Sequence, residues 1–276
     1  MGKRSEEIKF FKSIAMLLKL SLKMKEKVSV VIVTKDEESN ISECIRSVSW
    51  ADEIIVVDSG SKDRTCDVSR ELGADVIKRK WIGYADQKNF AIEQAKNNWV
   101  MSLDADERIS DNLREILFSI LRKDGIYEGY KFPRKNIFFG KWMKHGDLWP
   151  DYQIRLFRKG KASFNDRYVH ESVQVDGEVF ELNEPILHYS YQNVSEFFQR
   201  QKDYAILSAR ESLRRGITFK KTDIFFRPLW RFFRSYIIKS GWKDGIEGFI
   251  VSAGLAWYVF MRFAIILELK KKNEVS

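Results

Sequence analysis

Between Val28 and about Phe157, short β-branched apolar runs alternate with stretches whose apolar residues recur at helical spacing. The clearest strand-like runs are Val28 to Thr34, Glu53 to Asp58 and Trp99 to Leu103. Such runs, separated by helical stretches, are typical of βαβ units joined into a mostly parallel sheet. The pattern therefore predicts an α/β fold of Rossmann-like type, with helices flanking the sheet.

The two ends of the chain carry a different pattern, in which apolar and basic residues are mixed. Ile8 to Leu22 has apolar residues at helical spacing with lysines among them, which predicts a basic amphipathic helix. Phe225 to Lys239 mixes aromatic residues with arginines, a composition suited to the lipid headgroup region. The apolar run from Gly248 to Met261 is ~14 residues long, short of the ~20 that a spanning helix needs. Extending this run to Leu267 would make it longer, but it would place the charged Arg262 inside the apolar segment.

We therefore expect helical, membrane-associated termini that dock on the surface or insert shallowly, rather than a true span. The alternative is that these helices pack on the α/β core or on a second subunit. The chain divides accordingly into an N-terminal basic helix (1–27), an α/β domain (28–195) and a helical extension (196–276) that associates with a membrane or oligomerises. A length of 276 residues suffices for one such domain with extensions.

The positive net charge of the chain indicates that its partners are anionic. The formal net charge is +9, which attracts nucleic acid, anionic lipid headgroups or phosphorylated substrates. The two cysteines, Cys44 and Cys66, argue against a disulfide framework or a zinc cluster and favour a reducing cytoplasm. Lys12 and Lys19 interrupt the first apolar stretch, so it does not fit a secretory signal.

Acidic residues stand at the ends of the predicted strands. Ligands of parallel sheets gather beyond the carboxyl ends of the strands, so Thr34 and Asp58 should border a binding crevice. Asp58 has an equally simple alternative role as a helix N-cap. The third strand runs into Asp104-Ala105-Asp106-Glu107, where two carboxylates repel each other unless a cation lies beside them.

Magnesium binds through one or two carboxylates together with substrate phosphates. An Asp-x-Asp alone is a weak signal, because acidic loops are common before helices such as the one expected from Ile109 to Leu121. As the third of a series of strand-end acids, it indicates a nucleotide and metal site.

Three motifs in this order, Val28 to Glu38, Ile54 to Thr65 and Leu103 to Glu107, resemble the family two glycosyltransferases of the GT-A fold. The resemblance covers roughly residues 28 to 190. Three further segments, Gln87-Lys88-Asn89, Gln153 to Phe157 and Val169-His170-Glu171, are similar to the subgroup that includes lipopolysaccharide core β-1,4-glucosyltransferases.

The resemblance implies a metal-dependent, inverting transferase that moves a sugar from a UDP-sugar, with glucose as the first choice. The implied acceptor is the lipopolysaccharide core or another cell-surface glycolipid, at the cytoplasmic face of the inner membrane. The implied donor and metal residues are Asp58 near the uracil or ribose, Thr34, Lys35 and Glu37 lining the nucleotide pocket, Asp104 near the ribose or a metal-bound water, and Asp106 on Mg or Mn.

A single in-line displacement also needs a base that takes the proton of the attacking hydroxyl. By the resemblance, which places an acid shortly before an Arg-bearing strand, the candidate is Asp151. Glu171 and Asp147 are the competing candidates.

Two histidines, His188 and His170, and one aromatic segment each have two interpretations. His188 is a candidate third metal ligand or diphosphate contact, as GT-A enzymes often supply one late in the domain. His170 either orients an acceptor or phosphate or is an ordinary loop histidine. The aromatic segment from Phe132 to Trp149 could be an acceptor lid, because rings stack on sugars, or ordinary core.

Other classes of protein fit less well. A nucleic-acid-binding protein would leave the strand-end acids unexplained, because carboxylates repel phosphates without a metal. A metal-dependent phosphoesterase or nucleotidyltransferase would share the nucleotide and the metal but release a different nucleotide product. Transfer to polyprenyl phosphate would call for clearer spanning helices. The expected partners are thus a nucleotide sugar, a glycan or glycolipid acceptor and an anionic membrane surface, with a homo-oligomer as an open alternative.

Overall fold

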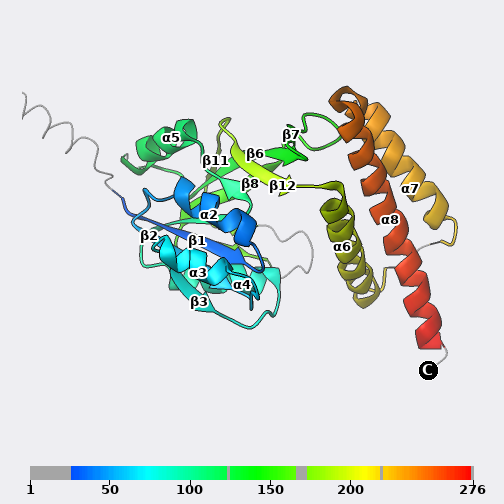
Figure 1. Ribbon diagram of the computed structural model, residues 1–276, viewed down its shortest axis with the longest axis horizontal. Coiled ribbons are helices and arrows are strands. Elements are labelled where there is room, and N and C mark those ends of the chain that lie inside the picture. Colours follow the sequence, from blue (N-terminus) through cyan, green and yellow to red (C-terminus); the bar gives the residue numbers. More distant parts are fainter. Residues whose placement is uncertain (1–25, 123–124, 166–172, 218–219, 275–276) are drawn as a thin grey trace, which may run out of the picture.

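The computed structural model describes residues 26–122, 125–165, 173–217 and 220–274. The helix expected from Ile8 to Leu22, and the residues His170 and Glu171, lie outside these ranges. Figure 1 shows an α/β domain with the C-terminal helices standing at one side of it.

The α/β domain alternates strands and helices in its first half and is rich in strands in its second. Its elements are β1 (Val28–Thr34), α2 (Glu38–Ser47), β2 (Glu53–Asp58), α3 (Thr65–Glu71), β3 (Asp75–Lys78), α4 (Tyr84–Gln94), β4 (Trp99–Asp104), β5 (Glu107–Arg108), α5 (Asp111–Arg122), β6 (Gly129–Phe138), β7 (Lys141–Trp142), β8 (Tyr152–Arg158), β9 (Ala162–Phe164), β10 (Val173–Val175), β11 (Val179–Glu181) and β12 (Ile186–Tyr191). The three strands and the α/β character expected from the sequence are confirmed.

The main sheet has the order β3-β2-β1-β4-β8-β6-β12-β5. Strands β3, β2, β1 and β4 are parallel, and the register pairs Thr34 with Asp58 and Val33 with Asp104. The ends of three strands therefore lie side by side at one edge. The sheet is less parallel than expected, because β8 runs antiparallel to both β4 and β6. The connection from β6 to β8 carries no crossover helix, and without one neighbouring strands pair antiparallel.

The apolar content of β1 reflects burial on both faces of the sheet. Val30 and Ile32 pack into one core, which also holds Ile41 of α2 and Leu117 of α5. Val31 faces the opposite core, together with residues of α4 such as Ala91. A strand buried on both faces reads as a continuous hydrophobic run rather than an alternating one.

Four helical segments and a long final helix follow the sheet. They are α6 (Val194–Arg214), α7 (Asp223–Phe233), the π-helical turn η1 (Arg234–Ile238), the 3-10 turn η2 (Gly241–Asp244) and α8 (Gly245–Glu274). Figure 1 shows α8 running alongside both α6 and α7. We call α6, α7, η1, η2 and α8 together the C-terminal helical unit.

Helix α8 is longer than the apolar run that marks it in the sequence, because it continues through Arg262. The Arg262 guanidinium donates to Ser212 Oγ of α6 at 2.8 Å, so this charge has a partner within the helical unit. At Gly254, a Cβ would lie only 2.1 Å from the ring of Phe197 in α6. The segment Gly241–Lys271 is long and apolar enough to cross a membrane, the one such helix in the described part of the chain.

Candidate active site

The loops that follow β1 and β2 are joined by hydrogen bonds into one rim. The Asp36 amide donates to Ser61 Oγ at 2.8 Å, and Asp36 Oδ1 accepts from the Lys62 amide at 2.7 Å. The Glu37 amide donates to Thr65 Oγ1 at 2.9 Å. Asp36 has a φ of 53°, a left-handed conformation that aspartate tolerates better than most residues. The rim places Thr34, Lys35 and Glu37 beside the end of β2.

Asp58 lies fully buried at the base of this rim. Its Oδ1 accepts from the amides of Gly60 and Ser61, both at 3.1 Å, and its Oδ2 accepts from the Ser61 hydroxyl. The carboxylate thus holds the turn after β2. The helix N-cap alternative is wrong, because α3 begins only at Thr65.

Thr34 and Lys35 differ in exposure although they are neighbours. Thr34 is buried, and its Oγ1 has no hydrogen-bond partner within the described ranges. Lys35 is exposed on the rim. A buried hydroxyl without a partner is uncommon in folded proteins, so a ligand that supplied one would satisfy it.

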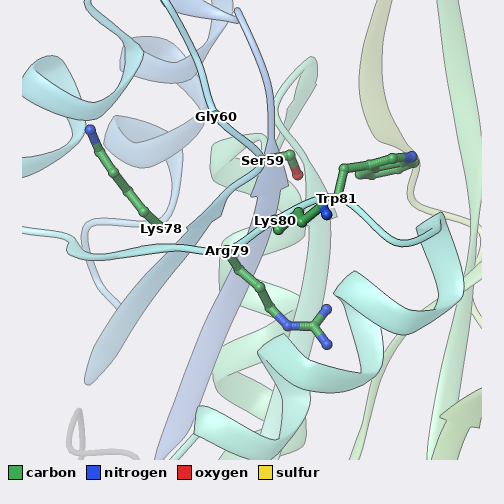
Figure 2. Close-up of a pocket in the computed structure, with 6 residues that line it drawn as sticks. All are labelled: Ser59, Gly60, Lys78, Arg79, Lys80 and Trp81. Atoms are coloured by element: carbon green, nitrogen blue, oxygen red, sulfur yellow. The ribbon is translucent and has the colours of Figure 1, made fainter.

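A hollow of about 490 Å³ opens beside the rim, at the carboxyl ends of β2 and β3 (Figure 2). It is lined by Ser59, Gly60, Lys78, Arg79, Lys80 and Trp81. Arg79 reaches toward α4, where it donates to Gln87 Oε1 at 2.7 Å, and Gln87 Nε2 donates in turn to Ser59 Oγ at 3.1 Å. Sequence reasoning missed this basic lining. The run Lys78-Arg79-Lys80-Trp81 was its available signal, but β3 is too short and too exposed to stand out as a strand.

Asp104, at the end of β4, is neutralised by two cations. Lys88 Nζ lies 2.9 Å from Oδ1, and an Arg155 amino group lies 2.5 Å from Oδ2. Burial raises the pKa of Asp104, but Arg155 and Lys88 outweigh it and hold that pKa well below its ordinary value. Arg155 also contacts the fully buried Glu107 at 2.6 Å, so it fastens both acids of this loop.

Asp106 meets His188 because β5 pairs with β12, with Glu107 opposite His188. His188 Nε2 lies 3.4 Å from Asp106 Oδ2. Burial raises the pKa of Asp106, and the neighbouring His188 outweighs it and lowers that pKa. Asp106 Oδ1 is buried and has no hydrogen-bond partner in the part of the chain that the structure describes.

The far side of the His188 ring is held by Asn136, its register partner in β6. His188 Nδ1 lies 2.6 Å from Asn136 Oδ1, an oxygen that can only accept. Nδ1 is therefore a donor. In the protonated ring Nε2–H also faces Asp106 and lowers the pKa of that carboxyl, whereas in the neutral ring Nε2 presents a lone pair that a cation beside Asp106 could accept. Metal-binding histidines are oriented in this way by a second hydrogen bond.

These two side chains fit a divalent cation as part of its ligand set. Within the described ranges no group of three His, Cys, Asp or Glu side chains could hold a metal. Asp106 and His188 would supply two ligands, and magnesium-type sites are commonly completed by substrate phosphates and water. The unpartnered Asp106 Oδ1 is the atom that such an ion would satisfy.

Arg200 of α6 is a site residue that sequence reasoning missed. Its guanidinium lies 3.0 Å from Glu37 Oε1 and 3.9 Å from Asp106 Oδ2. Burial raises the pKa of Glu37 and outweighs the opposing effects of Asn40 and Arg200. Arg200 lies in a polar helix beyond the motifs, so only the packing of that helix brings it to the rim.

Asp151 lies at the other end of the same network. Arg134 donates to Asp151 Oδ2 through Nε at 2.9 Å and Nη2 at 2.6 Å, and Gln153 donates to Oδ1 at 2.9 Å. Asn136 Nδ2 lies 3.4 Å from Oδ2, which links Asp151 through Asn136 to His188. Burial raises the pKa of Asp151, but Arg134 outweighs it and the pKa is lowered.

The competing acid Asp147 is placed differently. Its carboxylate faces Arg234 at 2.6 Å, Arg231 at 3.3 Å and Lys239 at 3.7 Å, all from the C-terminal part of the chain.

The aromatic segment from Phe132 to Trp149 contains both core residues and partly exposed residues. Phe138 belongs to a core cluster, with Phe139 packed against it. Trp142 and Trp149 lie partly exposed, edge to face at 5.3 Å.

Comparisons with known proteins agree with this geometry. Residues 29–174 match the model of the glycosyl transferase family 2. An uncharacterized glycosyltransferase of Rickettsia typhi is 32% identical over 261 residues, which cover 90% of this chain and 89% of that protein. The lipopolysaccharide core biosynthesis glycosyltransferase LpsC of Rhizobium meliloti is 30% identical over 247 residues, covering 87% and 92%.

Solved structures give weaker likenesses. S. aureus TarS 1-349 in complex with UDP has a TM-score of 0.45 at 15% identity, over 82% of this chain and 90% of that one. The family match spans more than half of the chain, and the relatives extend it into the C-terminal helical unit. The chain therefore belongs to glycosyltransferase family 2, and its α/β domain has the GT-A type of fold.

Proposed function

We propose that this glycosyltransferase moves a sugar, with glucose as the first choice, from a UDP-sugar to a lipopolysaccharide core or another cell-surface glycolipid. The observation that carries the proposal is the single network from Asp106 through His188 and Asn136 to Asp151, beside the rim at the carboxyl edge. The likeness to LpsC, named for lipopolysaccharide core biosynthesis, supports the acceptor class.

The donor nucleotide would occupy the rim and the neighbouring hollow. Thr34 Oγ1 needs a partner, and Lys35, Lys78 and Lys80 bring positive charge to a site that must take a diphosphate. Trp81 offers a partly exposed ring on which a base can stack. Asp104, with both oxygens already paired to cations, is suited to orient the ribose or a metal-bound water.

Asp106 and His188 would hold the divalent ion, Mg or Mn. A bound divalent ion supplies positive charge that stabilises the leaving diphosphate. Arg200, close to Asp106, adds a fixed positive charge on the same side of the site.

Asp151 is proposed as the base. In a single displacement, the acceptor oxygen forms a bond to the anomeric carbon while the bond from that carbon to the diphosphate oxygen breaks, and the configuration inverts. The acceptor proton passes to a carboxylate oxygen of Asp151. The lowered pKa keeps this carboxylate ionised at neutral pH, and Arg134 fixes its orientation. Glu171, outside the described ranges, is the competing base.

The C-terminal helical unit is proposed to lie on the cytoplasmic face of the membrane. No residue of α7 is buried, and Phe226, Leu229 and Trp230 are 68%, 67% and 58% exposed. Arginines alternate with these rings, as suits an anionic interface. Helix α8 packs along α6, which carries many charges, so a spanning α8 would draw those charges into hydrocarbon.

The test is product analysis with a panel of nucleotide sugars and deacylated or intact core glycolipids as acceptors. The expected result is release of UDP and formation of a glycosidic bond whose anomeric configuration is inverted relative to the donor, as measured by the anomeric coupling constant in NMR. Turnover should be lost when EDTA removes the metal. Release of a nucleoside monophosphate or of pyrophosphate would instead identify phosphoryl or nucleotidyl transfer and overturn the proposal.

A further inference from the structure

Four consecutive residues between β7 and β8, Lys144 to Asp147, are held by the C-terminal helical unit rather than by the sheet. The contacts that anchor them come from α7, η1, η2 and the residues between η1 and η2, which lie 84 to 100 positions later in the chain. We call this segment the docking loop. It leads directly to Leu148 and then to Asp151.

One end of the docking loop is fixed by Asp244, a carboxylate whose side chain is only 5% exposed. Asp244 Oδ2 accepts from the amides of Lys144 at 3.0 Å and His145 at 2.8 Å. Asp244 Oδ1 lies 2.7 Å from His145 Nδ1. Lys141 Nζ adds a bond to the Asp244 carbonyl at 2.6 Å. A buried carboxylate satisfied by several donors is a rigid anchor, because each donor would lose its partner if the loop moved.

The other end is fixed at Gly146 and Asp147. The Gly146 amide donates to the Lys239 carbonyl at 3.0 Å, and Ser235 Oγ donates to the Gly146 carbonyl at 3.1 Å. Asp147 has a φ of 74°, a conformation that costs energy for a residue with a side chain. The bond from Arg234 to its carboxylate at 2.6 Å helps to hold it.

The docking loop joins these anchors to the proposed chemistry. The Leu148 carbonyl accepts from Asn136 Nδ2 at 2.9 Å, and Asn136 also contacts Asp151 and His188. The carboxylate of Asp151 is therefore placed from two sides, by Arg134 within the sheet and by a loop whose position the helical unit sets.

We propose that Asp244 is a positioning residue for sugar transfer, and that the C-terminal helical unit builds the acceptor side of the site through the docking loop. The proposal rests on the proposed function, since it assigns Asp151 to the acceptor. It makes the helical unit more than an attachment, because hydrogen bonds connect that unit through the docking loop, Leu148 and Asn136 to the proposed base.

The test compares Asp244→Ala and Asp244→Asn with the matched control Asp223→Asn. Asp223 is a carboxylate of the same helical unit that pairs with Arg227 and has no contact with the docking loop. In the full-length enzyme, both Asp244 variants should lower kcat for transfer by about 10- to 100-fold, the cost of displacing a reacting group by ~1 Å. The dissociation constant for the UDP-sugar should stay within about 2-fold of the wild type, because the rim is unchanged.

A merely structural role would give a different result. If Asp244 only stabilises the fold, donor affinity, transfer and Tm will fall together, and this outcome overturns the proposal. Wild-type transfer in both Asp244 variants, or an equal loss in Asp223→Asn, overturns it as well.

Hydrogen exchange separates this proposal from the proposed function, because it needs no substrate. The amides of Lys144 and His145 should exchange faster in Asp244→Ala, while those of β1 stay protected. Unchanged exchange at the docking loop overturns the proposal even if sugar transfer is established. If the wild type transfers no sugar but the loop is released, the proposed function fails while the anchor stands.

Discussion

The proposed donor half and the proposed acceptor half of the site, called here the donor half and the acceptor half, are built in contrasting ways. The donor half comes from three neighbouring strand ends and the loops after them, all within residues 28–107. The acceptor half gathers Arg134, Asp151, His188 and the docking loop, which is anchored by residues far along the chain. The first is fixed by local order in a parallel sheet, the second by packing between distant segments.

The Asp-x-Asp motif stands where the two halves meet, and its two acids differ accordingly. Asp104 has both oxygens paired with cations, whereas Asp106 faces a histidine and keeps one oxygen without a partner. Sequence spacing alone makes the two acids look alike. Their surroundings differ: the ion pairs of Asp104 support the proposal that it orients a ligand, and, among the described residues, Asp106 keeps one oxygen free for a cation.

The largest expected effect comes from replacing Asp106, which lies where the two halves meet. Asp106→Ala should remove a metal ligand and lower turnover by ~10³-fold or more, since a bound metal is worth several kcal/mol in the transition state. Metal-dependent nucleotide binding should weaken in titration calorimetry while the circular dichroism spectrum is unchanged. The variant would contradict the metal assignment if it kept wild-type turnover in the presence of EDTA.

Asp151→Asn tests the acceptor half alone. Losing a positioned base should lower the transfer rate by ~10²–10⁴-fold. Donor affinity should be preserved, because Asp151 does not contact the rim. Glu171→Gln is the paired variant in the same assay. If Glu171→Gln loses transfer and Asp151→Asn retains it, the base is Glu171.

The membrane side is tested by replacing Phe226, Leu229 and Trp230 together with serine. Flotation with anionic vesicles should show most of the binding lost, because the exposed rings supply the buried apolar area. Added salt should remove only the part due to basic residues, about 1 kcal/mol for each one near the surface. Arg234 is left intact because it holds Asp147.

The control for that variant is Ile126→Ser, an exposed apolar residue of the α/β domain. It should leave vesicle binding unchanged, and both proteins should still turn over soluble donor. Failure of the wild type to float at low salt, with the α7 rings buried in a dimer, would favour the oligomer.

The smallest expected effect is a flat pH profile. Asp104, Asp106 and Asp151 all have a lowered pKa in the folded protein, so each stays ionised well below pH 7. Their contribution to stability is present above the ordinary aspartate pKa of about 3.9 and is lost as pH falls through the lower folded values. Transfer rates measured from pH 5 to 8 should show no step from these acids. A step near pH 6.5 would point to a histidine instead.

The sequence predicts well the strands and the shared edge on which the donor half is built, because those signals are local. A β-branched run predicts a buried strand, and an acid at its end predicts the edge where β1, β2 and β4 meet. The pairing of Asp106 with His188 was also anticipated, but only through the family resemblance. The turn-holding role of Asp58 was not, since it depends on two backbone amides after the strand.

The other features of the site and the fold depend on long-range packing, which the spacing of residues along the sequence does not encode. Arg200 reaches the rim only because α6 folds back beside β12, and Asp244 meets the docking loop across about 100 positions. The antiparallel course of β8 follows from its short connection rather than from its composition. Helix α8 is longer than the apolar run because Arg262, which closes that run in the sequence, has a hydrogen-bond partner in Ser212.

The close contact at Gly254 has a consequence for how this enzyme responds to change far from its reacting atoms. Phe197, which fills the space where a Cβ would stand, packs against Tyr191 at 4.9 Å, and Tyr191 ends the strand that carries His188. A single methyl group at position 254 would therefore press, through Phe197 and Tyr191, on the strand that carries His188. The spacing between α8 and α6 at this point depends on the absence of a side chain at Gly254, so a residue without chemistry of its own influences the position of the strand beside the site.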